Sequence, residues 1–192
     1  MISHREPFDR PHLGAALVYT LKGGPLGRRT LVDRTGFSES VVRTELNKLE
    51  ARGLVQFAKA GTTLTEEATR SFAGLFSRVR SVASLELGSL SLDACNRAAR
   101  VGKLPDESPS WQSRDLAVRE GATGTLLLRQ GAEGLAMPDG DGSFRERNPA
   151  AVQQIEEAFG RLDEGDYVVV VFAPDDARAA AGLWRILEGW VR

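Results

Sequence analysis

The chain has 192 residues, 42% of them hydrophobic, and its 25 Lys and Arg against 26 Asp and Glu leave a net charge of −1. This composition excludes a disordered or fibrous chain, and the length suits two compact domains, which we expect at residues 1–80 and 81–192. The longest apolar run, Val168 to Ala173, is too short to span a bilayer, and no basic-then-apolar leader begins the chain. We therefore expect a soluble, cytoplasmic protein, and the single cysteine, Cys95, excludes an internal disulfide.

The charge is unevenly distributed along the chain. Residues 1–80 hold 13 Lys and Arg against 8 Asp and Glu, whereas residues 81–192 hold 12 against 18. A basic region attracts the phosphates of a nucleic acid, and an acidic region is repelled by them. A nucleic-acid interface is therefore expected in the first half.

Two short helices are expected first. Leu13 to Lys22 has apolar residues at helical spacing, and the Gly-Gly-Pro from Gly23 to Pro25 ends this segment. Arg28 to Thr35 is expected as the second helix, with Gly36 and a buried Phe37 in the tight turn after it.

A longer helix is expected over residues 39–52, because Ser38 is a favoured N-cap and no Gly or Pro interrupts the run before Gly53. Val42, Leu46 and Leu49 form one apolar stripe that can pack on a core. The opposite face carries polar residues of the types that contact base edges and phosphates in a major groove, namely Ser40, Arg43, Thr44 and Asn47.

A hairpin follows. Leu54 to Lys59 alternates apolar and polar residues, Ala60 and Gly61 form the turn, and Thr62 to Thr65 pairs back before a helix that opens with two glutamates. Helix, helix, turn, helix and hairpin in this order predict a winged helix-turn-helix, with double-stranded DNA as the partner. Further DNA contacts are expected from Arg28, Arg29, Ser38, Lys48 and Lys59. Winged helices also dock proteins or RNA, so those partners remain alternatives.

The second half alternates strands and helices. A strand is expected within Val79 to Leu90, and Ser91 is expected to cap a helix that ends near Gly102. A loop rich in Pro and Ser, Lys103 to Ser113, then precedes a short helix from Arg114 to Glu120.

A hairpin, Thr123 to Gln130 with Gly134 to Pro138, and a helix, Pro149 to Leu162, come next. Tyr167 to Ala173 is a continuous apolar run, as expected for a central strand that is covered on both faces, and Asp175 to Val191 is the last helix. This order predicts an α+β fold whose second domain is a ferredoxin-like, split βαβ sheet.

The chain also resembles a family. The winged helix, the segments RDLAVREGATGTLLL and GLAMP, and the final VVVVFAPDDARAAAGLWRILEG are similar to an archaeal group of two-domain putative transcriptional regulators whose C-terminal domain has no known function. The resemblance implies two domains and DNA binding. It implies no catalytic residue and no effector.

Motifs that would indicate an enzyme or a metal centre are incomplete. Gly23 to Thr30 lacks the Gly-Lys-Ser/Thr ending of a phosphate-binding loop. Asp139 to Ser143 begins like a calcium loop, but Phe144 stands where that loop needs Gly. His4 and His12 with one cysteine make no zinc site. We expect no cofactor, no metal and no catalytic activity.

One group of residues in the second half has the character of a ligand site. Two arginines precede two glycines at the start of a strand, and an aspartate follows the end of the central strand, where small ligands commonly bind. The group is Arg114, Arg119, Gly121, Gly124 and Asp175. Arginine beside glycine-rich backbone favours a small anionic effector, although ion pairs and helix capping explain the same residues.

The leading hypothesis is a homodimeric transcriptional regulator that reads DNA with the third helix and uses its second domain for dimerisation or ligand sensing. The last helix, with Leu183, Trp184, Ile186, Leu187, Trp190 and Val191, is a candidate dimer contact or a plain core helix. The alternatives are a metabolite-binding protein or enzyme with an appended winged helix, and a protein-interaction scaffold.

Overall fold

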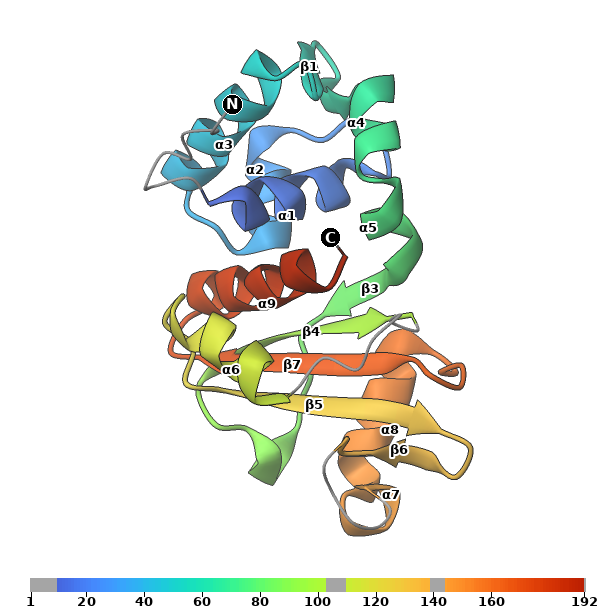
Figure 1. Ribbon diagram of the computed structural model, residues 1–192. Helices are drawn as coiled ribbons and strands as arrows, with labels where there is room; N and C mark the ends of the chain where they lie inside the picture. Colours follow the sequence, from blue (N-terminus) through green and yellow to red (C-terminus); the bar gives the residue numbers. More distant parts are fainter. Residues whose placement is uncertain (1–9, 103–109, 139–143, 192) are drawn as a thin grey trace, which may run out of the picture.

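The computed structural model describes residues 10–102, 110–138 and 144–191 (Figure 1). His4, most of the expected loop from Lys103 to Ser113, and the incomplete calcium motif at Asp139 to Ser143 lie outside these residues.

The N-terminal part has the element order of a winged helix-turn-helix. Its elements are α1 (Pro11–Leu21), α2 (Arg28–Thr35), α3 (Glu39–Ala51), β1 (Val55–Ala58), β2 (Gly61–Leu64), α4 (Glu66–Ser71) and α5 (Ala73–Arg78). The ends of α1, α2 and α3 lie within two residues of those expected from the sequence. Thr65 caps α4 by accepting a hydrogen bond from the backbone N–H of Ala68, but the helix breaks at Phe72 into two short pieces.

The turn between α2 and α3 depends on Gly36. Its φ of 74° is left-handed, and its N–H donates to the carbonyl of Val32, which closes the last turn of α2. The chain then reverses and buries Phe37, whose side chain is 3% exposed. This confirms the tight turn and the buried phenylalanine.

The C-terminal part is a five-stranded sheet with helices. Its strands are β3 (Val79–Ala83), β4 (Cys95–Val101), β5 (Gly124–Gly131), β6 (Gly134–Ala136) and β7 (Tyr167–Ala173). The strand order is β3-β4-β7-β5-β6, and every neighbouring pair is antiparallel. The other elements are the short 3-10 helix η1 (Gly88–Leu90) and the helices α6 (Ser110–Val118), α7 (Phe144–Arg147), α8 (Pro149–Phe159) and α9 (Asp176–Val191).

The helix expected from Ser91 to Gly102 is wrong, because this segment contains strand β4. The Ala- and Arg-rich sequence has a good local helix propensity, but β4 pairs residue by residue with β7 from Cys95 opposite Ala173 to Val101 opposite Tyr167. On its other side it pairs with β3. Two ladders of hydrogen bonds therefore override the local preference.

Strand β7 is central and buried along its whole length, as its apolar sequence indicates. Its side chains alternate between two cores: Val169 and Val171 belong to one hydrophobic cluster, whereas Val168 and Val170 belong to the other. Each face of the sheet is therefore covered.

The ferredoxin-like arrangement is not confirmed. β4 and β5 are both antiparallel to β7, which lies between them, so β4-α6-β5 is a split βαβ unit. However, α6 and α9 pack in the cluster on one face, through Ala117 and Leu183, while α8 packs in the cluster on the other, through Val152 and Ile155. A ferredoxin-like sandwich has both crossover helices on one face.

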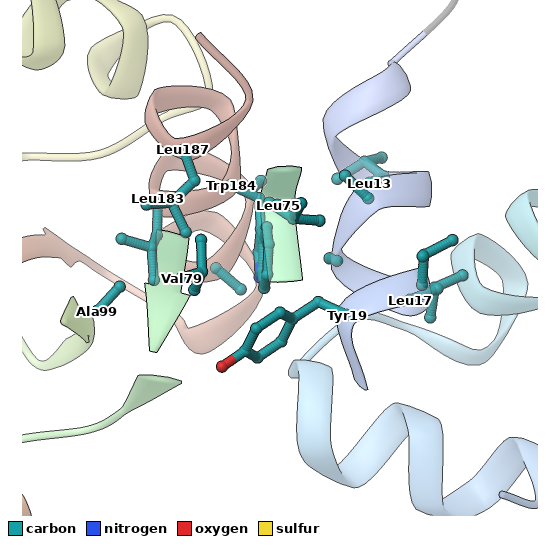
Figure 2. Packing of buried hydrophobic residues seen from close by; sticks show 14 of the residues in the cluster. Leu13, Leu17, Tyr19, Leu75, Val79, Ala99, Leu183, Trp184 and Leu187 are labelled. Atoms are coloured by element: carbon teal, nitrogen blue, oxygen red, sulfur yellow. The ribbon is translucent and has the colours of Figure 1, made fainter. Parts of the chain in front are cut away.

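The winged helix and the sheet share one hydrophobic core, with α9 between them (Figure 1). Figure 2 shows Tyr19 of α1 beside Trp184 of α9; their ring centroids are 5.2 Å apart. Leu183, Trp184, Ile186, Leu187 and Trp190 are all at most 8% exposed. The last helix is therefore a core helix, and its apolar side is not a free dimer contact.

No helix within the described ranges combines the length and the apolar character needed to cross a membrane.

Candidate nucleic-acid interface

Ser38 caps helix α3, which begins at Glu39, as expected. The Ser38 hydroxyl accepts a hydrogen bond from the backbone N–H of Val41 at 3.4 Å and lies 3.0 Å from the hydroxyl of Ser40. Glu39 follows in the first turn, where a negative charge interacts favourably with the helix dipole. Both hydroxyls are exposed at the N-terminal end of α3, the end that recognition helices direct at bases.

One side of α3 is anchored in the core. Val42, Leu46 and Leu49 are 0%, 1% and 3% exposed. Helix α1 packs against this stripe, since a Cβ placed on Gly14 would lie 3.6 Å from Leu49 Cδ2. The expected apolar stripe therefore holds the helix in a fixed orientation.

The opposite side of α3 is exposed, with Ser40, Arg43, Thr44 and Asn47 all open to solvent. In Figure 1 this helix lies on the outer side of the winged helix, away from the sheet. A rigid helix with exposed polar side chains on one face is the geometry that major-groove reading requires.

Lys48 has a structural partner that the sequence did not reveal. Its Nζ lies 2.8 Å from Oε1 of Glu45, whose side chain is buried at 6% exposure. Glu45 lies beside the buried stripe, and Lys48 compensates the charge of its buried carboxylate. The spacing of three residues was visible in the sequence, but the burial of Glu45 was not.

Arg28 and Arg29 are exposed at the start of α2. Arg28 Nη1 lies 3.8 Å from Oε1 of Glu39 at the start of α3, and both side chains are open to solvent. An exposed pair of this kind contributes little to stability, so a phosphate can compete for Arg28 at small cost.

The hairpin of β1 and β2 forms the wing, with Lys59 exposed at its turn. An antiparallel bridge between Leu26 and Thr62 fastens the wing to the loop before α2. Gly61 has a φ of 124°, and a Cβ there would lie 2.7 Å from the Leu26 carbonyl, so only glycine fits. Phe57 is 46% exposed although the alternation of the strand suggested a half-buried position, because the hairpin extends beyond the core.

The structure brings only part of the expected ligand site together. Asp175 accepts hydrogen bonds from the backbone N–H and from Nη1 of Arg178, at 2.8 and 2.9 Å. A Cβ on Gly121 would lie 2.9 Å from Cδ of the same Arg178, and one on Gly124 would lie 2.7 Å from Leu92. Arg178 thus joins Asp175 to Gly121, in contacts that cap α9 and pack the strand ends.

Arg114 and Arg119, the two arginines of that expected site, are exposed on and just after α6. No contact that brings either guanidinium to Asp175 or Gly124 is present among the described residues. Their role as ligand-binding residues stays a prediction.

The turn of the helix-turn-helix rests on an ion pair of the C-terminal part. Arg97 of β4 binds Asp176 of α9 through two hydrogen bonds, Nε to Oδ1 at 2.6 Å and Nη2 to Oδ2 at 2.5 Å. The Asp176 carboxylate lies directly against Gly36, so a side chain on that glycine would clash with it. Sequence reasoning missed Arg97 because it placed this residue on a helix.

A second polar contact joins α1 to the segment after α6. Oε1 of Glu120 lies 3.5 Å from Nε2 of His12, whose side chain is 2% exposed. This interaction with His12, followed by the charges of Arg10 and Arg185, lowers the pKa of Glu120, while partial burial opposes the shift.

Two family models match parts of the chain. Residues 16–78 match the CggR N-terminal DNA binding domain. Residues 96–188 match a domain of unknown function, DUF4443. No curated protein matches the chain.

The fold as a whole has a solved counterpart. A hypothetical protein from Pyrococcus horikoshii OT3 superposes with a TM-score of 0.73 over 93% of this chain and 91% of that chain, at 22% sequence identity. At this identity the likeness shows the fold alone. It covers both the winged helix and the sheet, so the two-part architecture is common to both proteins.

Within the described ranges, no group of three or more His, Cys, Asp or Glu side chains is arranged to hold a metal ion.

Proposed function

We propose that this protein is a DNA-binding transcriptional regulator that reads the major groove with α3. The observation that carries the proposal is the two-sided character of α3: Val42, Leu46 and Leu49 are buried, whereas Arg43 and Asn47 are exposed. The match of residues 16–78 to a DNA-binding domain supports it independently. The proposal includes no catalytic activity.

In the proposed complex, Ser40, Arg43, Thr44 and Asn47 face base edges and phosphates, while Arg28, Arg29 and Lys59 contact the backbone on either side. Ser38 contributes a further DNA contact from the N-terminus of α3. Lys48 contributes less, because Glu45 already binds its ammonium group.

The test starts from a duplex selected from a random pool by the wild-type protein. Arg43→Ala and Asn47→Ala are each expected to weaken binding to this duplex by about 1–3 kcal/mol, because a base contact is lost. Arg145→Ala, on α7 at the other end of the molecule from the wing, is the matched control and should bind normally (Figure 1). Unchanged affinity in both α3 variants would refute the recognition-helix assignment.

We further propose that the protein binds DNA as a homodimer, because one recognition helix reads only a short half-site and a dimer reads two about 34–36 Å apart. The contact must lie outside the buried side of α9. Light scattering at micromolar concentration, with and without the selected duplex, is expected to give the mass of two chains; a monomer in both samples contradicts the dimer.

A further inference from the structure

A cavity of about 330 Å³ lies at the junction of the winged helix and the C-terminal part. The winged helix contributes Tyr19 and Lys22 from the end of α1 and Arg34 from the last turn of α2. The other wall includes Arg97 of β4 and Leu183 and Trp184 of α9. The volume is in the range of small-molecule sites.

The cavity is basic. Its described lining contains three cations, Lys22, Arg34 and Arg97, and no acidic side chain. Asp176, which lies outside the lining, binds Nε and Nη2 of Arg97, so Nη1 is not part of that pair. Partial burial lowers the pKa of Lys22, and an anion beside its ammonium group would offset that cost.

The remaining surface is largely apolar or already hydrogen-bonded. The rings of Tyr19 and Trp184 are tilted against each other (Figure 2), and Leu183 also lines the cavity. The hydroxyls of Thr20 and Thr35 donate to the carbonyls of Ala16 and Leu31 in their own helices. The lining therefore offers few donors to a polyhydroxylated ligand such as a sugar phosphate.

Tyr19 supplies one further donor. Burial raises the pKa of Tyr19 to about 12, so its hydroxyl keeps its proton at neutral pH. A protonated phenol and two guanidinium groups suit a carboxylate, whose two oxygens accept bidentate hydrogen bonds from arginine.

We propose that this cavity binds a small organic carboxylate with a flat apolar body. Arg34, Arg97 and the Tyr19 hydroxyl hold the carboxylate, and Trp184 contacts the body. The ligand bridges the two parts of the protein, because Arg34 belongs to the winged helix and Arg97 to the sheet. This site differs from the one the sequence suggested around Arg119.

The position of the cavity connects it to the DNA-reading turn, and this connection rests on the proposed function. Arg97 holds the Asp176 carboxylate that lies against Gly36 between α2 and α3. A carboxylate at Nη1 of Arg97 places a second negative charge on the guanidinium group that already binds Asp176 through Nε and Nη2. Binding in the cavity therefore changes the support of the turn that positions α3, and by linkage DNA changes ligand affinity by the same factor.

The binding test is a calorimetric titration of the full chain with benzoate, phenylacetate and indole-3-acetate, each paired with its neutral amide. At least one acid is expected to bind with a stoichiometry of one, and its amide is not. Arg34→Gln, at an exposed position, should weaken the binding about tenfold or more, because a charge-assisted contact is lost. Arg145→Gln on α7 is the matched control and should leave it unchanged.

Three results overturn the site: no acid binds the wild type, an acid binds Arg34→Gln as tightly as Arg145→Gln, or Arg119→Ala abolishes binding while Arg34→Gln does not. The last result moves the site to Arg119, just after α6. Because Arg34 is exposed and its loss removes no core contact, a folding failure does not confound this variant.

The coupling is measured separately, as the affinity for the selected duplex with and without a saturating acid. A change of about 5- to 150-fold is expected, the usual range for coupled sites. An acid that binds but leaves DNA affinity unchanged refutes the coupling and retains the site. A chain that binds the acid but no duplex at any salt concentration refutes the proposed function and also retains the site.

Discussion

Single residues on α3 differ in whether they have a partner among the residues that the structure describes. Lys48 and Arg43 are both exposed cations on this helix, but Lys48 binds the buried carboxylate of Glu45 at 2.8 Å. Removing Arg43 should therefore weaken DNA binding, whereas removing Lys48 should chiefly lower the stability of the fold.

Lys48→Ala is expected to lower the free energy of unfolding by about 1 kcal/mol, the low end for an unpaired buried group because water reaches this side of the pair. Chemical denaturation measures the effect. In a Glu45→Gln background the same substitution should cost less, since no charge is left without a partner. Equal costs in both backgrounds would show that the pair contributes nothing.

Among the elements, the wing contributes to the proposed DNA complex through the charge of Lys59. The bridge at Leu26 and the base of the hairpin tie β1 and β2 to the core, and Lys59 stands exposed at the turn. A cation at that place reaches a phosphate rather than a base, so it adds affinity without sequence preference.

Lys59→Ala should weaken binding to the selected duplex and to random duplexes by the same factor. The slope of log affinity against log salt concentration should become shallower by about 0.9, the value for one lost phosphate contact. Fluorescence anisotropy over a salt series measures this slope, and Arg145→Ala is the control that leaves it unchanged. A loss confined to the selected duplex would instead place Lys59 against a base.

At the scale of the whole molecule, the winged helix and the sheet are parts of one body rather than separate modules. The core that contains Leu17 of α1 also contains Val169 of β7 and Leu187 of α9. Two polar pairs lie at the same junction. Arg97 binds Asp176 beside Gly36, and His12 lies next to Glu120. Acid conditions should loosen this junction.

Glu120 is the group at which this acid sensitivity can be measured. Its pKa is lowered in the folded protein, chiefly by His12. The ionised form therefore stabilises the fold above the ordinary glutamate value of about 4.3, and this contribution is lost as the pH falls through the lowered pKa. Wild type should be more stable than Glu120→Gln at pH 7, and the difference should shrink below about pH 4.

Urea denaturation of both proteins over a pH series provides the measurement. Glu133→Gln, at an exposed position in the β5-β6 turn, is the control for removing a carboxylate elsewhere. A constant difference between wild type and Glu120→Gln across the acid range would contradict the contribution of this carboxylate.

The sequence by itself determined the winged helix. Ser38 caps α3, Gly36 and Gly53 end helices, and the spacing of Val42, Leu46 and Leu49 defines the buried side, so these features depend on neighbours a few residues away. The same holds for the exposure of Arg43 and Asn47. Strand β7 was also predictable, because a short run of seven apolar residues rich in valine fits a strand that is buried on both faces.

Only the tertiary structure decided β4, the order of the sheet and the contacts of the junction. The segment around Arg97 prefers a helix locally and becomes a strand because β3 and β7 offer hydrogen bonds on both sides. Arg97 and Asp176 are 79 residues apart in sequence, and His12 and Glu120 lie in different halves. Contacts between residues so far apart produce no periodic pattern in the sequence. They arise when elements pack together, and the local sequence does not encode which elements pair.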